Sequence, residues 1–468
     1  MLSHEDNVLL TRTNSGTPMG ELFRRFWIPV LLSAELPEPD GPQVRVKLLG
    51  EELLAFRDSD GRIGLIEPRC PHRGANLFFG RNEQCGIRCA FHGWKFDVHG
   101  ACVDIPIVDP EVAPGMRAKA RINAYPTREW GDFVWAYLGP VVHSSRGRPD
   151  DTALAASQLQ GQGQLELPAL PAMEFALLPA SHRHVSKKLQ ECNWAQAAEG
   201  ALDTAHFSFL HQPVGNSEAE LQARAAQATR GFAKGSMNHV HMRWMRDDAR
   251  PRYAIVPHAA GMVLGTSRAA EQGERYWRIA QYLMPCHGYT PSAMPGQTYH
   301  AQSWVPIDDE SCWVYVYSWN PDRPLSDDER AGYNKGGAVY ADIGPDWRPV
   351  RNRANDYLLD RALQKTENFT GITGVSEQDA AIQDSQGRIA DRTRELLGAT
   401  DVGVVQFRRL MLQAAKALQE GMEPAWATAP EAYLVRAGGI VADAALSFDA
   451  VMLQRFGDAL GRVGPPLG

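Results

Sequence analysis

Alternating apolar and polar positions characterise the first part of the chain. Residues 43–66 follow this pattern around the stretch VRVKLLGEELLAFRD, with Gly and Asp interrupting it, as is typical of short antiparallel strands. Similar interruptions continue as far as a last strand-like run, DFVWAYLGP, at residues 132–140. The pattern therefore predicts a compact all-β unit that ends near residue 142.

A stretch rich in Ser, Gly, Gln and Pro follows and predicts a linker over residues 143–170. Beyond the linker, residues 190–211 carry helical signals, and helical periodicity dominates again after residue 350. Strand-like runs lie between these regions, among them RYAIVP, GMVLGTSRAA, RYWRIAQYLMP and SCWVYVYSW. Within residues 401–419 the following apolar residues share one helical face: Val404, Phe407, Met411, Ala414 and Leu418.

These elements predict an α+β protein with two domains. Residues 1–142 would form the all-β domain with an N-terminal segment, and residues 143–170 would form the linker. Residues 171–468 would form a larger domain in which an antiparallel sheet is flanked by helices, some of them at the C-terminus. A chain of 468 residues is long enough to bury two such cores.

Composition and charge narrow the functional classes. Apolar residues make up 44% and charged residues 22% of the chain, as in ordinary globular proteins. The net charge of -7 gives no support for binding nucleic acid or membranes, and no apolar run is long enough to cross a bilayer. The N-terminus, MLSHEDNVLL, is too polar for a secretory signal, so we expect a cytoplasmic protein.

The cysteines point to metal binding. There are seven, an odd and sparse set that argues against a disulfide framework. Four of them lie between residues 70 and 102, with histidines among them. In a reducing compartment, this clustering predicts a metal site.

Two closely spaced Cys/His pairs define that site. Cys70 and His72 are separated by one residue, and Cys89 and His92 by two. A Rieske [2Fe–2S] cluster needs two thiolates for one iron and two imidazoles for the other, so two short loops could each supply one ligand to each iron. The alternative is a structural zinc site of the Cys2His2 type, for which Cys85 could compete as a ligand.

The motifs around these pairs resemble a known domain. C-P-H-R-G-A-x-L followed by C-x-x-H-G-W-K-F-D-x-x-G is similar to the Rieske domain of the ring-hydroxylating oxygenases. The resemblance implies that Cys70, His72, Cys89 and His92 bind the cluster. Phe91 stands where relatives often have Tyr, and the missing hydroxyl would alter hydrogen bonding near the cluster.

A second constellation lies in NWAQAAEGALDTAHFSFLH, which contains Glu199, Asp203, His206 and His211. On a regular helix the two histidines would lie roughly 140° apart, so both reach one metal only if the helix ends or bulges between them. Two imidazoles and one carboxylate leave positions open for O2, as in non-haem Fe(II) oxygenases. The alternative is a helix that carries two half-buried, hydrogen-bonded histidines.

The resemblance also assigns catalytic roles in this stretch. The residue that matches Asp203 links the mononuclear iron to the Rieske cluster of a neighbouring subunit in the family, which implies an oligomer. Asn193 would lie near the iron and the substrate, and Glu199 completes the motif. We therefore expect Asp203, Asn193 and Glu199 to be the catalytic residues.

The third iron ligand must come from elsewhere in the chain. The stretch TGITGVSEQDAAIQDSQGRIADRTRELLGATD resembles the C-terminal part of phthalate dioxygenase-like oxygenases, and this resemblance implies Asp379 as the ligand. Asp384 is the main rival. In a different interpretation, Ser376 and Asp379 form a capping box at a helix start.

Arginines become candidates if the substrate is a carboxylate, because a guanidinium binds it in a bidentate pair. Arg268, among apolar neighbours, is the first candidate, followed by Arg278 and Arg252. For each one a solvated or salt-bridged arginine is an equal alternative. Residues 213–240, rich in Ala, Gln and Gly, would form either a lid over the pocket or a surface insertion.

The resemblance as a whole implies a terminal oxygenase component with a Rieske [2Fe–2S] cluster and a mononuclear Fe(II). It would cis-dihydroxylate an aromatic acid such as phthalate, chlorobenzoate or phenoxybenzoate; the alternative is an O-demethylating monooxygenase of methoxylated aromatic acids. The family further implies a homotrimer and a separate NADH-dependent reductase with FMN and [2Fe–2S]. A Rieske electron carrier and a zinc-stabilised binding protein are the two other classes.

Overall fold

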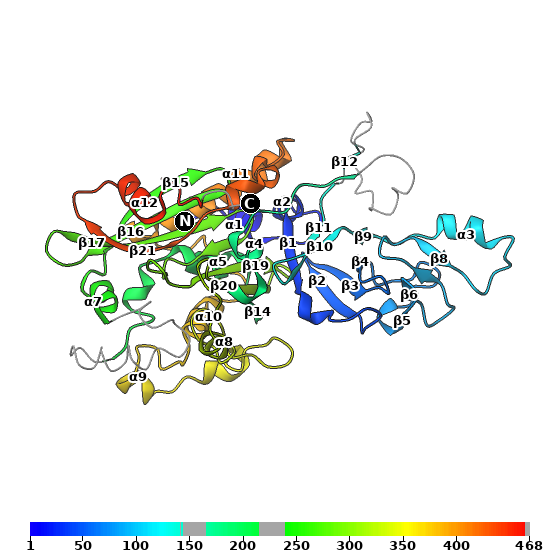
Figure 1. The fold of residues 1–468 in the computed structure, drawn as a ribbon, viewed down its shortest axis with the longest axis horizontal. Coiled ribbons are helices and arrows are strands. Elements are labelled where there is room, and N and C mark those ends of the chain that lie inside the picture. Colours follow the sequence, from blue (N-terminus) through cyan, green and yellow to red (C-terminus); the bar gives the residue numbers. More distant parts are fainter. Residues whose placement is uncertain (141, 144–164, 215–238, 464–468) are drawn as a thin grey trace. The chain divides into compact units, whose positions relative to one another are not determined.

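The computed structural model describes residues 1–140, 142–143, 165–214 and 239–463 (Figure 1). The predicted linker and the predicted lid or insertion at residues 213–240 lie largely outside the described residues. The chain divides into two compact units, Thr13–Leu170 and Met1–Arg12 with Pro171–Gly468. The first twelve residues therefore group with the larger, C-terminal unit, whereas the sequence pattern places them in the N-terminal domain.

The N-terminal unit consists of small antiparallel sheets, as expected for an all-β domain. One has the strand order β2-β3-β4-β9, with β2 (Val44–Leu48), β3 (Glu51–Arg57), β4 (Ile63–Ile66) and β9 (Ala124–Tyr125). A second has the order β1-β11-β10, with β1 (Trp27–Leu32), β11 (Phe133–Tyr137) and β10 (Thr127–Trp130). A third has the order β5-β6-β7-β8, with β5 (Arg81–Asn82), β6 (Ile87–Arg88), β7 (Lys95–Phe96) and β8 (Cys102–Asp104). The strands predicted within residues 43–66 and 132–140 are thus confirmed.

The core of this unit brings the cysteine-rich loops together. Side chains of the first and third of these sheets, such as Leu54 and Phe96, are buried in one cluster with Cys70, Cys89 and Trp94. Burial of apolar side chains is the main stabilising term in such a small β unit. The two loops therefore rest on a rigid apolar base.

The larger unit is built around an eight-stranded antiparallel sheet. Its strand order is β14-β20-β19-β18-β17-β16-β15, with β21 paired to β17 outside this path. The strands are β14 (Arg183–Gln190), β15 (Arg252–His258), β16 (Gly261–Ala269), β17 (Glu274–Leu283), β18 (His287–Tyr289), β19 (Tyr299–Pro306), β20 (Cys312–Trp319) and β21 (Gly438–Asp443). The predicted antiparallel sheet is confirmed.

Strand β17 is the centre of the pairing pattern. One of its edges pairs with β16 over nine positions, and the other edge is divided between β21 and β18. The sequence pattern predicts mainly helices after residue 350 and misses β21. The reason is that GGIVAD becomes a strand through its pairing with β17, which lies far away in the sequence.

Helices cover both faces of this sheet. Helix α5 (Trp194–Leu202) contacts β17, β18 and β19, and α11 (Val402–Gln419) packs against α5. On the opposite face, α12 (Phe448–Phe456) packs on β21 (Figure 1). The face that carries α5 and α11 also carries the polar side chains Thr266 and Arg278, which are neighbours across β16 and β17.

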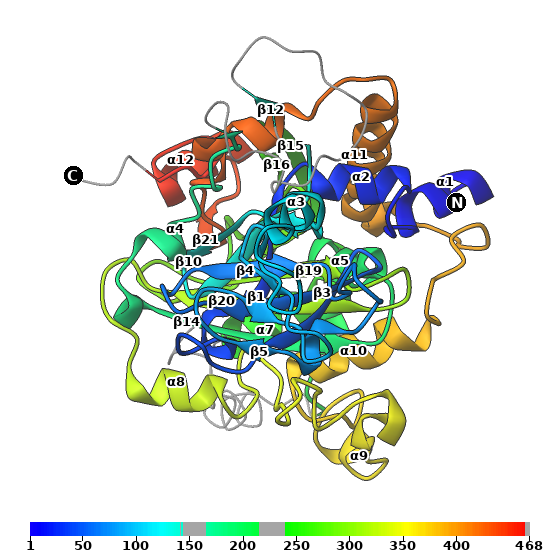
Figure 2. The same cartoon turned by 90° about the vertical axis from the view of Figure 1, so that its right-hand side faces the viewer.

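The N-terminal helix α1 (His4–Thr11) belongs to the same unit and lies beside α11 (Figures 1 and 2). Its Asn7 amide donates to the Ala390 carbonyl (3.2 Å), and Asp6 pairs with Lys416 (2.7 Å). These contacts explain why the first residues group with the C-terminal part of the chain. The short polar sequence of α1 gives no sign of this long-range partner.

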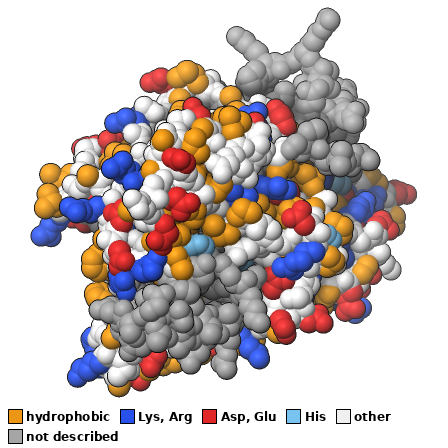
Figure 3. All heavy atoms as spheres, turned by 60° about the vertical axis from the view of Figure 1, so that its left-hand side comes forward, with side chains coloured by type: hydrophobic (Ala, Val, Ile, Leu, Met, Phe, Trp, Pro, Cys, Tyr) orange, Lys and Arg blue, Asp and Glu red, His pale blue; other side chains and the backbone are white. Residues whose placement is uncertain are grey.

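Among the described residues, none of the helices combines the length and apolar character that crossing a bilayer requires. Acidic and basic side chains are interspersed over the face drawn in Figure 3, in keeping with the small net charge of -7.

Packing of α12 on the sheet gives a first testable prediction. A Cβ atom at Gly265 in β16 would collide with the ring of Phe448, so Gly265→Val would force the helix away from the sheet. We expect this overpacking to lower the free energy of unfolding of the larger unit by about 1–3 kcal/mol. The control is Gly344→Ala, where the added Cβ meets only ordinary contacts at 3.5 Å. Urea unfolding followed by circular dichroism measures both, and equal stability of the two variants would contradict the packing argument.

Candidate metal centres and substrate cavity

Two loops of the N-terminal unit share one construction. In the first, the Cys70 N–H donates to the carbonyl five residues ahead (2.9 Å), and the Gly74 N–H donates back to the Cys70 carbonyl (2.8 Å). In the second, the Cys89 N–H donates to the carbonyl five residues ahead (2.8 Å), and the Gly93 N–H donates back to Cys89 (2.9 Å). Both glycines have positive φ angles of 71° and 75°, which Gly adopts at little cost.

These loops bring two thiols and two imidazoles together. The ring centroids of His72 and His92 lie 4.6 Å apart, and His72 stacks on Trp94 at 4.8 Å. Burial, together with the neighbouring Cys89 thiol, raises the pKa of Cys70 to about 11. The buried Nδ1 of His92 makes no hydrogen bond within the described residues, so its lone pair is available to a metal. This donor set fits a [2Fe–2S] cluster with mixed ligands.

The other cysteines of this region lie elsewhere. Cys85 groups with Asp58 and Asp60, and Arg62 pairs with Asp58 at 2.7 Å. Cys102 is buried and its Sγ lies 3.6 Å from a backbone carbonyl two residues ahead. Cys85 therefore does not compete as a ligand with Cys70, His72, Cys89 and His92.

Helix α5 ends at Leu202, just before Asp203 and the two histidines. The Asp203 carboxylate accepts hydrogen bonds from the N–H groups of Ala205 (2.8 Å) and His206 (3.4 Å), which competes with continuation of the helix. The helix predicted over residues 190–211 is thus wrong in its extent, since it stops at Leu202. The chain then forms turns, and the histidines are no longer restricted to helical spacing.

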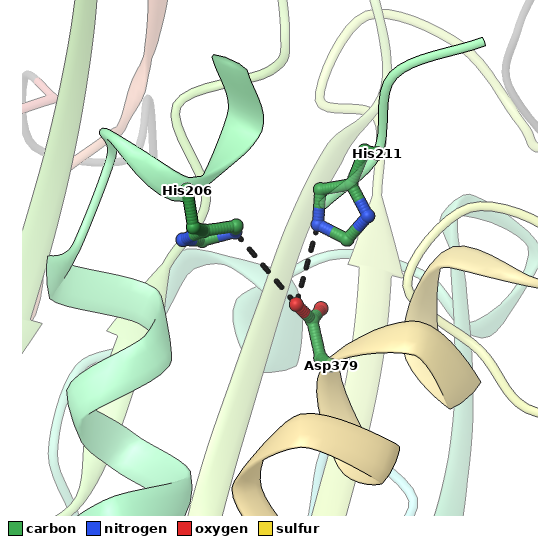
Figure 4. A group of neighbouring side chains, drawn as sticks. All are labelled: His206, His211 and Asp379. Carbon is green, nitrogen blue, oxygen red and sulfur yellow. Dashed lines mark ion pairs between the residues drawn. The ribbon is translucent and has the colours of Figure 1, made fainter. Parts of the chain in front are cut away.

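The turns bring His206 and His211 to Asp379 (Figure 4). His206 begins a short 3-10 turn (His206–Ser208), and Asp379 lies on α10 (Val375–Ser385). Nε2 of His211 lies 3.2 Å and Nε2 of His206 lies 3.7 Å from Oδ1 of Asp379. Two imidazoles and one carboxylate that face a common point could hold a metal ion.

Neighbouring side chains orient both rings. The His211 Nδ1 lies 2.7 Å from Oε1 of Gln378, whose amide nitrogen donates to the Ile372 carbonyl (2.9 Å). On the other side, Nδ1 of His206 lies 3.7 Å from Asp203. Carboxylate and amide partners of this kind fix the tautomer and the direction of metal-binding histidines.

The protonation pattern tests whether a cation fits this site. Because Gln378 donates through its nitrogen elsewhere, its oxygen accepts, and His211 carries its proton on Nδ1. In the neutral ring, Nε2 then presents a bare lone pair to the Asp379 oxygen 3.2 Å away. Two facing lone pairs repel each other, and a bound cation turns this repulsion into attraction. The donor set therefore fits Fe(II).

The sequence left two other interpretations of this stretch: Asp384 as the iron ligand, and Ser376 with Asp379 as a capping box. Asp384 is buried and accepts a short hydrogen bond from the Tyr357 hydroxyl, and burial raises its pKa. Ser376 does not cap the helix, because Gly374 occupies the N-cap position. The capping-box interpretation is therefore wrong.

A strained segment contacts both parts of the chain that carry the triad residues. Asp356–Leu358 have φ angles between 49° and 56°, a left-handed conformation that costs non-glycine residues energy. This turn directs Tyr357 to Asp384 on α10. Further along, the Phe369 N–H donates to the Gln212 carbonyl (2.9 Å), next to His211. One segment thus contacts both sides of the metal site.

A cavity of about 80 Å³ lies beside the triad. Its apolar walls come from Ala197, Ala201, Phe207, Trp304 and Val339, and its polar lining includes Lys188, Gln190, Asp203, His206, Arg278, Thr290, Ser292, Ser376, Asp379 and Gln383. A cavity with apolar walls and a few convergent polar groups is the common form of a small-molecule site.

The three candidate arginines have different surroundings. Arg278 lines the cavity, is 1% exposed, and none of its three guanidinium nitrogens has a hydrogen-bond partner in the described structure. Its Cζ lies 4.3 Å from the centre of the Phe207 ring. Arg268 is fully buried behind the cavity and donates to the Thr204 carbonyl (2.7 Å); burial and the charge of Arg278 lower its pKa to about 10. Arg252 lies exposed on the edge strand β15.

Two expected catalytic residues lie away from the cavity lining. The Asn193 amide caps α5 and donates to two backbone carbonyls (2.7 and 2.8 Å). Glu199 accepts hydrogen bonds from Arg392 (2.9 Å) and Arg408 (2.8 Å). The structure thus gives both residues partners within the fold, whereas Asp203 lines the cavity.

Several residues of the site were not singled out from the sequence. Gln378, which orients His211, adjoins Asp379 in the chain and could have been found from that pair. Lys188 and Gln190 alternate on β14, so they share one face of the strand. Phe207 and Trp304 have no signal in the sequence that separates them from core residues.

Comparison with known proteins identifies the family. Residues 26–126 match the Rieske [2Fe-2S] domain, and residues 162–445 match the family described as LigXa C-terminal domain like. The phthalate 4,5-dioxygenase oxygenase subunit of Pseudomonas putida is 39% identical over 90% of this chain and 88% of its own length. The chain belongs to the Rieske aromatic ring-hydroxylating oxygenases.

Further relatives agree with this family. The 3-chlorobenzoate-3,4-dioxygenase oxygenase subunit of Comamonas testosteroni is 34% identical to this Rieske oxygenase over 96% of the chain and 98% of its own length. A crystal structure of dicamba monooxygenase bound to 3,6-dichlorosalicylic acid has a TM-score of 0.51 at 16% identity, covering 85% of this chain and 98% of that one. The second likeness shows the fold alone.

The family establishes the cofactors and the class of reaction. This Rieske oxygenase is an oxidoreductase, the terminal oxygenase of its system, and it uses a Rieske cluster and a mononuclear iron. The two donor sets described above fit these groups, and each lies within one compact unit.

The triad geometry predicts different results for two aspartates of α10. Asp379→Ala removes an oxygen that faces both histidines, so we expect loss of about one iron per chain with the cluster retained. Asp384→Asn keeps the shape of a residue outside the triad and should retain full iron content. Iron and sulfide analysis with electron paramagnetic resonance of the reduced cluster measures both. Full iron in Asp379→Ala, or its loss only in Asp384→Asn, would reverse the assignment.

Proposed function

We propose that this Rieske oxygenase hydroxylates an aromatic carboxylate bound in the cavity beside the His206, His211 and Asp379 triad, by cis-dihydroxylation of the ring. In this proposal Cys70, His72, Cys89 and His92 hold the cluster, and the triad holds the iron. When bound, the cluster stores and passes on single electrons and the iron activates O2. The residues of the chain bind the substrate, orient it and exclude water.

We infer the class of substrate from the buried guanidinium of Arg278, which has no hydrogen-bond partner among the described residues. A buried guanidinium without a partner is costly, because its desolvation is not compensated by hydrogen bonds. A substrate carboxylate would supply two charge-assisted hydrogen bonds to it. The charge of Arg278 also acts on His206, so the anchored acid would lie close to the triad. The names of two relatives, with phthalate and 3-chlorobenzoate as substrates, agree with an aromatic acid.

The apolar walls would hold the ring of the acid. Phe207 packs under Arg278, and Trp304 lies on β19 in the middle of the sheet. Offset or edge contacts with such aromatic side chains favour a flat ring over water. A dry cavity also strengthens the interaction between Arg278 and an anion.

We further propose that Asp203 links the mononuclear iron to the Rieske cluster of a neighbouring subunit in a homotrimer, and that electrons pass between the two centres along this hydrogen-bonded connection. The carboxylate lines the cavity and lies 3.7 Å from His206. Burial acts to raise the pKa of Asp203, but its interactions with His206 and with backbone N–H groups lower it below the usual value. The electrons would come from a separate NADH-dependent reductase with FMN and a [2Fe–2S] cluster, as the designation of the relatives as oxygenase subunits suggests.

Removal of the guanidinium tests the substrate class. We expect Arg278→Met to raise the KM for aromatic acids roughly 10- to 100-fold, because a charge-assisted pair is lost, while iron and cluster content stay unchanged. Arg275→Met, on the same strand but bonded to Ser267, is the matched control. Substrate-dependent O2 uptake measures the effect. An unchanged KM in Arg278→Met would refute the role of this residue as the anchor.

The proposed electron path gives a separate prediction. Asp203→Asn keeps the size of the side chain and its ability to accept hydrogen bonds, but removes the charge beside His206. We expect both metal centres to be retained and reoxidation of the reduced cluster to slow by at least about tenfold, because the charged link to the imidazole is lost. Stopped-flow absorption in a single turnover records this rate. Reoxidation as fast as in the unmodified enzyme would exclude the linking role.

A further inference from the structure

The cavity contains a second buried cation, Lys188. Its side chain lies on β14, is 4% exposed and lines the cavity. The ammonium donates to the hydroxyl of Ser376 (2.6 Å) and to the carbonyl of the same residue (3.2 Å). No carboxylate of the described residues forms an ion pair with it. An ammonium has three N–H donors, so one remains for a ligand.

Lys188 and Arg278 line the cavity from two strands that are not neighbours in the sheet. They belong to β14 and β17, which are separated in the sheet by β20, β19 and β18. Four strand spacings of roughly 4.8 Å lie between their backbones, so one small acidic group cannot pair with both cations. The cavity residue Trp304 lies on β19, between these two strands.

The polar groups of the cavity follow the same division. Lys188 has Gln190, Ser376 and Gln383 as polar neighbours, and Gln190 donates to Gln383 (2.5 Å). On the β17 side the lining includes Arg278, and the lining residues Thr290 and Ser292 follow β18 in the chain. Phe207 lies against Arg278, whereas Trp304 and the polar Gln302 lie on β19, between the strands of the two cations. The cavity thus combines apolar walls with a buried cation on each of two separated strands.

The iron-binding triad lies within electrostatic reach of both cations. Arg278 interacts electrostatically with His206, whereas Lys188 interacts with Asp379. A ring whose two ends are held by these cations would lie beside the triad. Its orientation would then be fixed at two points instead of one.

We propose that Lys188 recognises a second anionic or hydrogen-bond-accepting group of the substrate, on the far side of the ring from the carboxylate that Arg278 binds. This inference rests on the proposed function and narrows it to rings that carry two acceptors in a 1,3 or 1,4 relation. Adjacent acceptors, in a 1,2 relation, would both lie near Arg278. Lys188 would then contribute no more to their binding than to that of benzoate.

A purely structural role for Lys188 makes a different prediction. Glu377, Asp379 and Asp384 all lie within its electrostatic reach, so the lysine could serve only as their counter-charge. In that case its loss would weaken iron binding and would affect all substrates equally. Recognition of the substrate would instead change the preference among substrates.

The experiment compares four acids on four proteins. The proteins are the iron-loaded enzyme, Lys188→Met, Lys188→Arg and the control Lys187→Met. Lys187 is the neighbour of Lys188 on β14, and its side chain lies over the ring of Trp313. The acids are benzoate and its 1,2-, 1,3- and 1,4-dicarboxylate counterparts. Anaerobic titration calorimetry gives each Kd, and iron analysis shows whether the metal site is intact.

We expect the enzyme to bind the 1,3 or 1,4 diacid more tightly than benzoate by roughly tenfold or more, as one additional charge-assisted hydrogen bond provides. Lys188→Met should abolish this preference and leave the Kd of benzoate unchanged. Lys187→Met should retain it, and Lys188→Arg, which keeps the charge, should restore most of it.

Three results with Lys188→Met would overturn the inference. These are equally weakened binding of all four acids, loss of iron from the variant, or loss of a preference for the 1,2 diacid that the unmodified enzyme shows. The first two would establish the counter-charge role. If no aromatic acid binds to the unmodified, iron-loaded enzyme, the proposed function itself fails. If benzoate binds and the diacids bind no more tightly, only the role of Lys188 fails.

Discussion

The end of helix α5 at Asp203 is the constraint on which the iron site depends. The Asp203 carboxylate accepts two backbone hydrogen bonds just beyond the helix and so favours a turn over a further helical residue. A continuous helix would place His206 and His211 about 140° apart. With the turn, both rings point their Nε2 atoms at one oxygen of Asp379. One side chain thus shapes the metal site and also lines the cavity beside it.

The third ligand is held in place from outside the turn. Helix α10 carries Asp379. The segment that contains the strained turn at Asp356–Leu358 contacts this helix through Tyr357, and it contacts the turns that carry the two histidines through Phe369. The energetic cost of three left-handed residues is offset by burial of Tyr357 and its hydrogen bond. Ligands that are more than 160 residues apart in sequence are thereby kept at a fixed separation.

Much of this architecture could be predicted from the sequence. Several strands of both units follow from alternating or strand-like runs, and the Cys/His spacing predicted the two loops that carry the paired ligands. Interactions between distant segments could not be predicted. Examples are the pairing of β21 with β17, the association of α1 with α11, and the partners of Glu199. Arg268 and Arg278 illustrate the limit, since both look alike in sequence and only packing shows which one reaches the cavity.

The unpaired guanidinium of Arg278 also disfavours the binding of uncharged molecules. A neutral hydrocarbon of the right shape would displace water from the cavity. The guanidinium would then have no group to accept its hydrogen bonds. The apolar contacts of the hydrocarbon would have to overcome that penalty. A buried charge therefore discriminates by rejection as well as by attraction. Uncharged arenes such as benzene or toluene would be excluded by electrostatics, although they are small enough to enter.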